Sequence, residues 1–310
     1  MTRGKDTLRV AARHLPGFVG VLGLLAVASV TVAPWSNAAP TAAPSTPPSC
    51  GGITLYKSPG VPWTCTFDDE FNGTSLNTND WTVQQTSISS YHSGQECFVN
   101  SPNNVSVSGG LLNLTVRKEA APFVCAAPSG NYVTQYTSGM VTSYTHFSQT
   151  YGAFAVRAKI PAQTAQGLQE AFWLWPDSQE GPQNIIPGGS ELDIAEMYSQ
   201  YPNMVAPTVH YGMMTFRPSV TDDNCSLSDA STEFNNYVII WTPSQLQFDY
   251  DGQTCLTVNR SPGSLLGGSA WFTTPYFLNL TQALGVGGNA PDTGTLQSAT
   301  TQVDWVRVWS

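Results

Sequence analysis

Three carboxylates fall within six residues of one short segment of this sequence. Glu191, Asp193 and Glu196 are interleaved with apolar residues in the segment 190–197, which reads SELDIAEM. Carboxyl groups held this close push their pKa values apart, so that one can keep a proton while another is ionised. Glycoside hydrolysis needs such a pair, about 5–5.5 Å apart for retention of configuration and farther apart for inversion. A solvated strand face and a calcium site made of carboxylates are the alternatives that the spacing leaves open.

The alternation of acidic and apolar residues predicts a β-strand with a bulge. In a regular strand, Glu191 and Asp193 point to one face, and the apolar residues that alternate with them point into a core. Strict alternation would then turn Glu196 toward the core, where an unpaired charge is costly. One extra residue at 194–195 would return Glu196 to the face of the other two acids. The segment therefore predicts a bulge, with three carboxylates on one face.

The composition favours an all-β fold that would position this strand. Of the 310 residues, 41% are hydrophobic and only 11% are charged, which is not typical of a disordered chain. The 27 glycines and 22 prolines indicate many turns, and Thr, Ser, Val and Asn are more frequent than good helix formers. Runs such as 112–116, 154–158 and 237–241 are rich in strand-forming residues. We expect one β domain, about residues 53–310, built as a sandwich or barrel.

The N-terminus is typical of an export signal. A basic stretch precedes the uncharged segment 17–33, and small residues at 36–38 offer a cleavage site. We therefore expect a signal peptide over residues 1–38, a Pro/Ala/Ser/Thr-rich linker over 39–52, and a secreted domain. Because the segment 17–33 nearly reaches the length of a bilayer span, an uncleaved membrane anchor is the alternative.

Net charge argues against nucleic acid as a partner. The chain carries 12 Lys and Arg against 21 Asp and Glu, which gives a formal net charge of −9 at pH 7. A surface of this sign repels a phosphate backbone. A neutral polymer remains compatible with it.

Six cysteines lie beyond the expected signal peptide. An even number in an exported chain predicts disulfides, although six cysteines allow fifteen pairings. Their order along the chain favours pairing of successive cysteines. The resulting pairs are Cys50–Cys65, Cys97–Cys125 and Cys225–Cys255. The sequence contains no spacing of cysteines and histidines that is typical of a zinc site.

The acidic segment resembles the E-x-D-x-x-E signature of glycoside hydrolase family 16, in its bulged, laminarinase-like form. Further segments that are similar to this family follow in the same order. They are 67–73 with Leu76 and Trp81, 138–143, 151–159, 171–174, 210–212, 241–243, 277–280 and 304–309. The resemblance spans roughly residues 65–310. It implies a β-jelly-roll (concanavalin-like) sandwich of two antiparallel sheets with a carbohydrate cleft on its concave face.

The resemblance also implies a role for each carboxylate. By position, Glu191 would be the nucleophile and Glu196 the acid/base, while Asp193 between them would orient and electrostatically tune the pair. The implied protein is a secreted, retaining endo-glycosidase that hydrolyses β-1,3- or mixed β-1,3/1,4-linked glucan by double displacement. Its partner would be a polysaccharide, and a monomer is the default for a secreted depolymerase.

Neighbouring residues are candidates for binding the sugar. Trp173 and Trp175 share one face of the preceding strand and could stack on sugar rings, with core packing as the alternative for Trp173. His210 matches a family histidine that could hydrogen-bond the sugar or Glu196, and a structural histidine is the alternative. Glu96 lies in a segment that resembles a family Asn-Glu near the glycone-binding end.

One departure from the family concerns the substrate. Family laminarinases usually carry Gly-x-Trp-Pro before Ala-Phe-Trp, whereas this chain has Gln169 and Glu170 in place of Trp-Pro. These polar side chains could accept hydrogen bonds from sugar hydroxyls, and Glu170 could be a fourth acid near the site. The departure leaves the preference for β-1,3-glucan open. A transglycosylase, a galactan-cleaving relative and a carbohydrate-binding lectin are the alternative functions.

The implied chemistry requires no cofactor. Family members often carry a structural calcium on the convex side. Asp69, Glu70 and Asp304 could supply oxygens to such an ion, although no loop shows a diagnostic ligand spacing.

Overall fold

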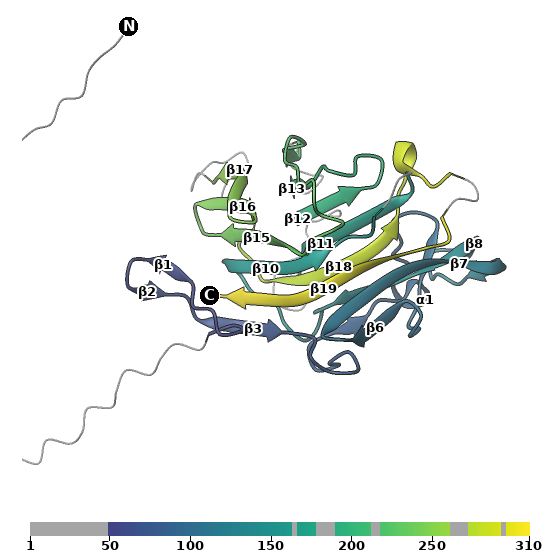
Figure 1. Cartoon of the computed structure of the whole chain (residues 1–310), viewed down its shortest axis with the longest axis horizontal. Helices are drawn as coiled ribbons and strands as arrows, with labels where there is room; N and C mark the ends of the chain where they lie inside the picture. The colour runs from purple at the N-terminus through teal and green to yellow at the C-terminus, as the bar shows by residue number, and fades with distance from the viewer. Residues whose placement is uncertain (1–48, 163–165, 178–189, 212–217, 261–271, 293–295) are drawn as a thin grey trace, which may run out of the picture. The chain divides into compact units, whose positions relative to one another are not determined.

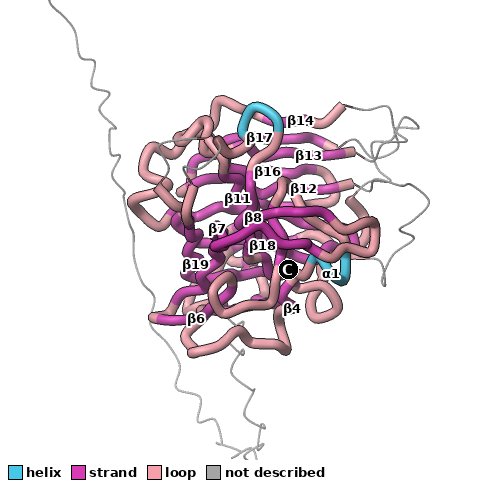
Figure 2. Tube along the Cα trace, turned by 90° about the vertical axis from the view of Figure 1, so that its right-hand side faces the viewer, coloured by secondary structure: helices cyan, strands magenta, loops and turns pink. Residues whose placement is uncertain are grey.

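Strands dominate the part of the chain that the structure describes. This computed structural model describes residues 49–162, 166–177, 190–211, 218–260, 272–292 and 296–310. The expected signal peptide and the first ten residues of the expected linker lie outside these ranges. Helical turns occur within them at α1 (Thr86–Ser89) and at the 3-10 turn η3 (Gly287–Asn289) (Figure 2). No helix among the described residues has the length and apolarity needed to cross a membrane.

The larger of two main sheets contains ten strands among the described residues. In chain order they are β3 (Cys65–Asp69), β5 (Glu96–Phe98), β6 (Val105–Ser108), β7 (Leu111–Cys125), β8 (Tyr132–Ser138), β10 (Gly152–Lys159), β15 (Asn235–Trp241), β16 (Gln245–Tyr250), β17 (Gln253–Asn259) and β19 (Ser298–Trp309). The sheet runs β17-β16-β15-β10-β19-β7-β8-β5, with β3 paired to β19 and β6 paired to β7. Its pairs are antiparallel except β5 with β8.

The smaller sheet carries the acidic segment. Its described strands are β4 (Thr82–Val83), β9 (Met140–Thr142), β11 (Leu168–Pro176), β12 (Glu191–Tyr198), β13 (Ala206–His210), β14 (Val220–Thr221) and β18 (Tyr276–Leu284). They run in the order β14-β13-β12-β11-β18-β9-β4, and every pair is antiparallel. The acidic strand β12 therefore lies between β11 and β13 (Figure 1). The prediction of an all-β sandwich of two sheets is confirmed.

Alternating apolar side chains fill the space between the two sheets. In β15, Tyr237, Ile239 and Trp241 are fully buried, and the residues between them are partly exposed. Leu192 and Ile194 enter the same core from β12. Burial of such a side chain contributes roughly 1.5–3 kcal/mol. The core fixes the strand registers, because a slip of one residue would turn every apolar side chain to the wrong face.

A short hairpin precedes the sandwich. It consists of β1 (Tyr56–Ser58) and β2 (Val61–Pro62), which lie beside the end of β19 (Figure 1). Thr64 exchanges backbone hydrogen bonds of 3.0 and 2.9 Å with Ser310 at this point. Leu55 and Trp63 pack against the outer face of the larger sheet.

The folded unit begins before residue 53, which corrects the predicted end of the linker. Cys50 is fully buried and forms a disulfide with Cys65. The backbone N–H of Gly51 donates a hydrogen bond of 2.7 Å to the carboxylate of Asp68. Residues 49–52 therefore belong to the fold, because the disulfide ties them to β3.

All six cysteines form disulfides. The pairs are Cys50–Cys65, Cys97–Cys125 and Cys225–Cys255. The predicted pairing of successive cysteines is confirmed. Three disulfides are compatible with folding in an oxidising compartment.

Candidate active site

A β-bulge in β12 turns the three carboxylates toward one face, as the sequence predicts. Asp193 and Glu196 are three positions apart in β12, but their partners in β13 are only two positions apart. The extra residue lies at 194–195, where both side chains are fully buried. The Tyr250 hydroxyl of the opposite sheet donates a hydrogen bond of 2.9 Å to the Ile194 carbonyl. This bond satisfies a buried backbone acceptor at the irregular point of the strand ladder.

The carboxylates line a cleft on the outer face of the smaller sheet. Glu191 and Glu196 are partly exposed, whereas Asp193 between them is only 3% exposed. The cleft has a volume of about 240 Å³. Its other lining residues are Tyr91, Ser93, Gln169, Ala171, Trp173, Trp175, His210 and Thr281. The structure thus brings seven of the nine predicted site residues together, and Glu96 and Glu170 are the exceptions.

His210 contacts the central carboxylate of the cleft. It pairs with Glu191 across β12 and β13, and its Nε2 lies 3.0 Å from Oδ2 of Asp193. The two atoms are in close contact, but they lack the alignment of a hydrogen bond. On the other side of the ring, Nδ1 lies 2.7 Å from the Ser219 hydroxyl. His210 therefore contacts Asp193, and the predicted hydrogen bond from His210 to Glu196 is not among the contacts of the described residues.

Burial raises the pKa of both Glu191 and Asp193. The neighbouring Asp193 raises the pKa of Glu191 further, while His210 acts in the opposite direction. Glu196 adds to the rise in the pKa of Asp193. The pair consequently holds a proton at pH values where ordinary carboxyl groups are ionised. An ionised carboxylate can then stand beside a protonated one.

Hydrogen bonds from residues of three strands hold the side chain of Glu196, and a loop residue supports one of the donors. Its Oε1 accepts from the Tyr198 hydroxyl at 2.7 Å and from Nε2 of Gln169 at 3.1 Å. Oε2 accepts a longer bond of 3.4 Å from the Thr208 hydroxyl. The Ser93 hydroxyl donates to Oε1 of Gln169 at 3.2 Å, which turns the amide NH₂ group toward Glu196. These four residues fix the orientation of one carboxylate.

Tyr198 was not predicted from the sequence. Burial and the adjacent Glu196 carboxylate raise the pKa of the Tyr198 phenol, so it stays protonated and donates. Its position two residues after Glu196 could have placed it on the same face of a strand. No comparable sequence signal marks Tyr91, Ser93 or Thr208, because they reach the site from other segments.

The aromatic residues form one wall of the cleft. Trp173 is 7% exposed, and its indole N–H donates a hydrogen bond of 2.9 Å to the Thr281 hydroxyl. Its ring lies 5.7 Å from that of Tyr91 and 6.0 Å from that of Trp175, between ring centroids. Trp173 therefore both packs and lines the cleft, whereas Trp175 is only partly buried and presents more of its surface. Aromatic surface of this kind can contact the apolar face of a sugar ring.

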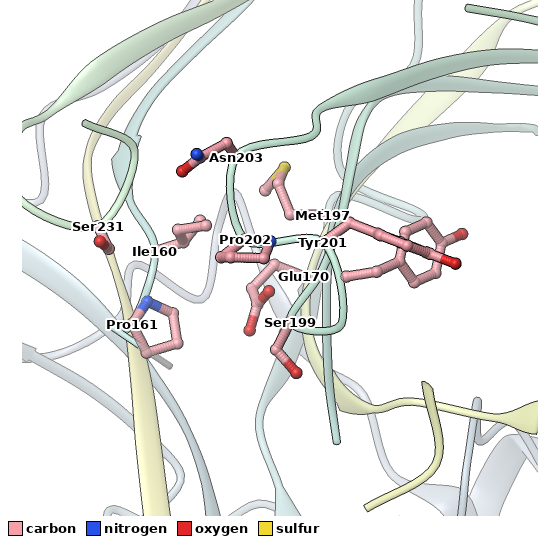
Figure 3. A pocket seen from close by; sticks show the side chains of 10 residues that line it. Ile160, Pro161, Glu170, Met197, Ser199, Tyr201, Pro202, Asn203 and Ser231 are labelled. Atoms are coloured by element: carbon pink, nitrogen blue, oxygen red, sulfur yellow. The ribbon is translucent and has the colours of Figure 1, made fainter. Parts of the chain in front are cut away.

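Glu170 lies outside the cleft, so the prediction of a fourth acid near the site is wrong. Successive residues of β11 face opposite sides, and Gln169 takes the cleft side. Glu170 is 2% exposed, and its Oε1 accepts a hydrogen bond of 2.8 Å from Nε2 of Gln282. It borders a separate cavity of about 50 Å³, between Pro161, Ser199 and Pro202 (Figure 3). Burial raises the pKa of Glu170 to about 8.

Glu96 is also absent from the cleft, which corrects its predicted position at the sugar. The side chain is fully buried and accepts hydrogen bonds from the backbone N–H groups of Ser93, Gly94 and Leu284, at 2.7, 3.0 and 3.1 Å. A Cβ at position 94 would lie 2.7 Å from the Leu284 carbonyl oxygen, so only glycine allows this approach. Glu96 thus shapes the loop that carries Tyr91 and Ser93 to the cleft.

The three carboxylates suggested for calcium take other partners. Asp69 accepts a hydrogen bond of 2.9 Å from a tryptophan indole N–H. Glu70 receives two bonds from Arg307, at 2.7 and 3.0 Å, and Asp304 pairs with Arg157. Among the described residues that are not in a disulfide, Glu191, Asp193 and His210 of the cleft form the one group whose potential metal ligands lie within 4.8 Å of one another. The structure therefore does not bring the suggested calcium ligands together.

Fold and cleft together define a glycoside hydrolase domain: a two-sheet β-sandwich presents crowded carboxylates, a histidine and aromatic rings on the outer face of one sheet. The family model for the family 16 domain of β-porphyranases A–D matches residues 64–310. The chain belongs to glycoside hydrolase family 16.

Individual relatives support the family and differ in what their names say they act on. The endo-1,3-1,4-β-glycanase ExsH of Rhizobium meliloti (strain 1021) is 29% identical over 79% of this chain and 51% of its own length. The keratan-sulfate endo-1,4-β-galactosidase of Sphingobacterium multivorum is 30% identical over 56% of this chain and 40% of its own length. The solved laminarinase of Rhodothermus marinus superposes with a TM-score of 0.67 at 25% identity, covering 80% of this chain and 97% of that one. The chain spans about half the length of the first of these relatives.

Proposed function

We propose that this domain is a secreted, retaining endo-glycosidase that hydrolyses a β-1,3- or mixed β-1,3/1,4-linked glucan. The observation that carries the proposal is the bulge in β12, which sets Glu191, Asp193 and Glu196 along one cleft. Relatives named as endo-1,3-1,4-β-glycanase and laminarinase support the choice of glucan. Export is supported by the N-terminal sequence and the three disulfides. We propose a monomer, because all three carboxylates of the cleft come from one strand of one chain.

The proposed reaction has two displacement steps. In the first, ionised Glu191 attacks the anomeric carbon while Glu196 gives its proton to the leaving glycosidic oxygen. The C–O bond breaks and a glycosyl–enzyme ester forms. In the second, Glu196 takes a proton from water, the water oxygen attacks the same carbon, and Glu191 leaves. Asp193 shares its proton with Glu191 and so holds the nucleophile in place as its charge changes.

A second candidate is the cleavage of a β-galactan on the same site. The matching family model describes porphyranases, and one relative is named as a galactosidase. In the cleft, the amide of Gln169 occupies the position where the laminarinase pattern has tryptophan, so hydrogen bonding replaces stacking there. Such a change favours a sugar whose hydroxyl groups differ in orientation from those of glucose.

Product analysis on a polysaccharide panel tests both candidates. The panel contains laminarin, lichenan, porphyran, carrageenan, arabinogalactan and xyloglucan, and compares the wild type with Glu191→Ser. Glu170→Gln is the matched control, because it removes a carboxyl group from the same sheet but outside the cleft.

We expect short oligosaccharides from a glucan with the wild type and with Glu170→Gln, and none with Glu191→Ser. Products from a galactan alone would favour the second candidate, and products longer than the substrate would favour transglycosylation. Binding without cleavage of any polysaccharide would overturn the hydrolase and leave a lectin.

A further inference from the structure

A second hollow lies at the end of the sandwich, where the hairpin β1–β2 meets the larger sheet. We call it the hairpin pocket; its volume is about 520 Å³, compared with about 240 Å³ for the cleft. Tyr56, Lys57 and Trp63 line it from the segment 56–63, and Tyr151, just before β10, lines it from the sheet side, where the fully buried Trp241 of β15 lies beneath it. Its described lining residues are all different from those of the cleft. The volume lies within the range of about 300–1,000 Å³ that is usual for ligand sites.

The aromatic rings of the hairpin pocket are held in place by the surrounding fold. A two-stranded hairpin is only marginally stable by itself. Here the Cys50–Cys65 disulfide closes its base, and the backbone N–H of Trp63 donates a hydrogen bond of 2.8 Å to the Leu55 carbonyl. The pocket is therefore preformed, which lowers the entropy cost of binding a ligand.

Two features of the pocket oppose the stability of the fold, so folding by itself does not explain them. Tyr56 keeps 61% of its surface exposed, although water contact with an aromatic ring opposes stability. Tyr151 adopts a positive φ of 63°, an uncommon conformation for a bulky residue. This conformation sets the Tyr151 ring edge-on to Trp241 at 5.4 Å between centroids. Exposed aromatic surface and local backbone strain at one place indicate a binding role.

The chemistry of the lining points to a sugar. Among the described residues that line the pocket there is no acidic side chain, although the chain carries a formal net charge of −9. Among the described side chains that line it, the one that is charged belongs to Lys57, with Nζ 4.6 Å from the Trp63 ring centroid, and Thr150 and Thr242 add hydroxyl groups. Aromatic rings can cover the apolar face of a pyranose, while hydroxyl and ammonium groups bond its hydroxyls.

We propose that the hairpin pocket is a second carbohydrate site, which binds a pyranose unit of a polysaccharide away from the catalytic cleft. The hairpin residues that build it lie before residue 64, where the family match begins. A polymer held there stays attached to the domain, so its other segments reach the cleft at a raised effective concentration.

Affinity electrophoresis in gels that contain laminarin, lichenan or porphyran tests this site. Every protein carries Glu191→Gln, so that the polymer is not degraded during the run. Tyr56→Ser removes the exposed ring, and Tyr201→Ser is the matched control because Tyr201 is similarly exposed, at 53%, and lies outside the pocket. Thermal unfolding of each variant verifies that the fold is kept, and Lys57→Ser is a second pocket variant that leaves every ring in place.

We expect at least one polysaccharide to retard the parent protein, and Tyr56→Ser to weaken that binding about fivefold, whereas Tyr201→Ser leaves it unchanged. Equal retardation of Tyr56→Ser and the parent, or no retardation of the parent by any of the three polymers, would overturn the second site. Cleavage is measured separately. If binding depends on Tyr56 and no polymer is cleaved by the wild type, the proposed hydrolase is wrong and the second site stands.

Discussion

Gln169 and Glu170 point to opposite faces of β11, as successive residues of a strand do. The amide of Gln169 therefore enters the cleft and bonds Glu196, whereas the carboxyl of Glu170 is buried behind the sheet. Gln169 replaces an aromatic residue of the laminarinase pattern with a donor to one of the two proposed catalytic acids.

Removing that donor tests the role of Gln169. We expect Gln169→Ala to lower kcat about tenfold, because Glu196 loses one of the two hydrogen bonds to its Oε1. Tyr198→Phe removes the other bond and should act in the same direction. Both bonds orient the same atom, Oε1 of Glu196. The loss of transition-state stabilisation in the double variant should therefore differ from the sum of the losses in the two single variants. Strictly additive losses, measured as kcat and KM for all three variants, would contradict a shared positioning role.

The buried carboxyl of Glu170 makes stability depend on pH. Its pKa in the folded state, about 8, is higher than the ordinary value of 4.5, so the folded protein binds the proton more tightly than the unfolded chain. This contribution to stability is present in full below about pH 4.5 and is lost as the pH rises to about 8.

Glu170→Gln should remove this dependence while keeping the shape of the side chain. We expect the free energy of unfolding of the variant to exceed that of the wild type by an amount that grows from pH 5 to pH 8 and then stays constant. Urea unfolding at intervals across this range measures it. A difference between the two proteins that is independent of pH would show that Glu170 is not the titrating group.

At the scale of the element, the bulge in β12 depends on a contact from the opposite sheet. Tyr250 in β16 donates its hydroxyl to the Ile194 carbonyl, while its cross-strand neighbour Tyr237 has a buried hydroxyl without a hydrogen-bond partner among the described residues. Both tyrosines are at most 3% exposed. The two tyrosines are a matched pair for mutation, because the hydroxyl of Tyr250 makes a hydrogen bond and that of Tyr237 makes none among the described residues.

We expect Tyr250→Phe to lower the free energy of unfolding by about 1–2 kcal/mol, because it leaves the buried Ile194 carbonyl without its donor. Tyr237→Phe removes an unpaired hydroxyl and should leave stability unchanged or raise it. Chemical unfolding followed by tryptophan fluorescence compares the two variants. If they lose the same stability, the bond to the bulge is not what Tyr250 contributes.

At the scale of the whole molecule, the Cys225–Cys255 disulfide joins the two layers at one edge. Cys225 follows β14, the edge strand of the smaller sheet, and Cys255 lies in β17, the edge strand of the larger sheet. The two cysteines are 30 positions apart in the chain. A crosslink that closes a loop of this length restricts the unfolded chain considerably.

The double variant Cys225→Ser/Cys255→Ser should therefore lose about 3–4 kcal/mol of stability. Guanidinium unfolding measures this loss. Activity below the unfolding temperature should be kept, because neither cysteine lines the cleft. Lost activity in a variant that is still folded would mean that the edge disulfide also positions the catalytic strand.

Features that depend on neighbours along the chain could be predicted from the sequence alone. The period of two in the acidic segment, together with the cost of a buried charge at Glu196, was sufficient to predict the bulge and the three carboxylates on one face. Composition and turn residues were sufficient for an all-β sandwich or barrel, and the resemblance to the family selected the sandwich. The pairing of successive cysteines followed from their order.

Only the tertiary structure decided which residues from distant segments meet. Glu96 and Glu170 are acids close to predicted site segments, yet both are buried away from the cleft. The loop before β5 wraps around the carboxylate of Glu96. Glu170 points to the face of β11 opposite the cleft, because Gln169 before it takes the cleft side. Tyr91 and Ser93 reach the cleft because the loop after α1 folds over β11, and the hairpin pocket exists because residues 56–63 dock against β10 and β15. The physical reason is common to all of these. A local pattern fixes which way a side chain points relative to its own strand, whereas strand pairing and loop packing fix what it points at.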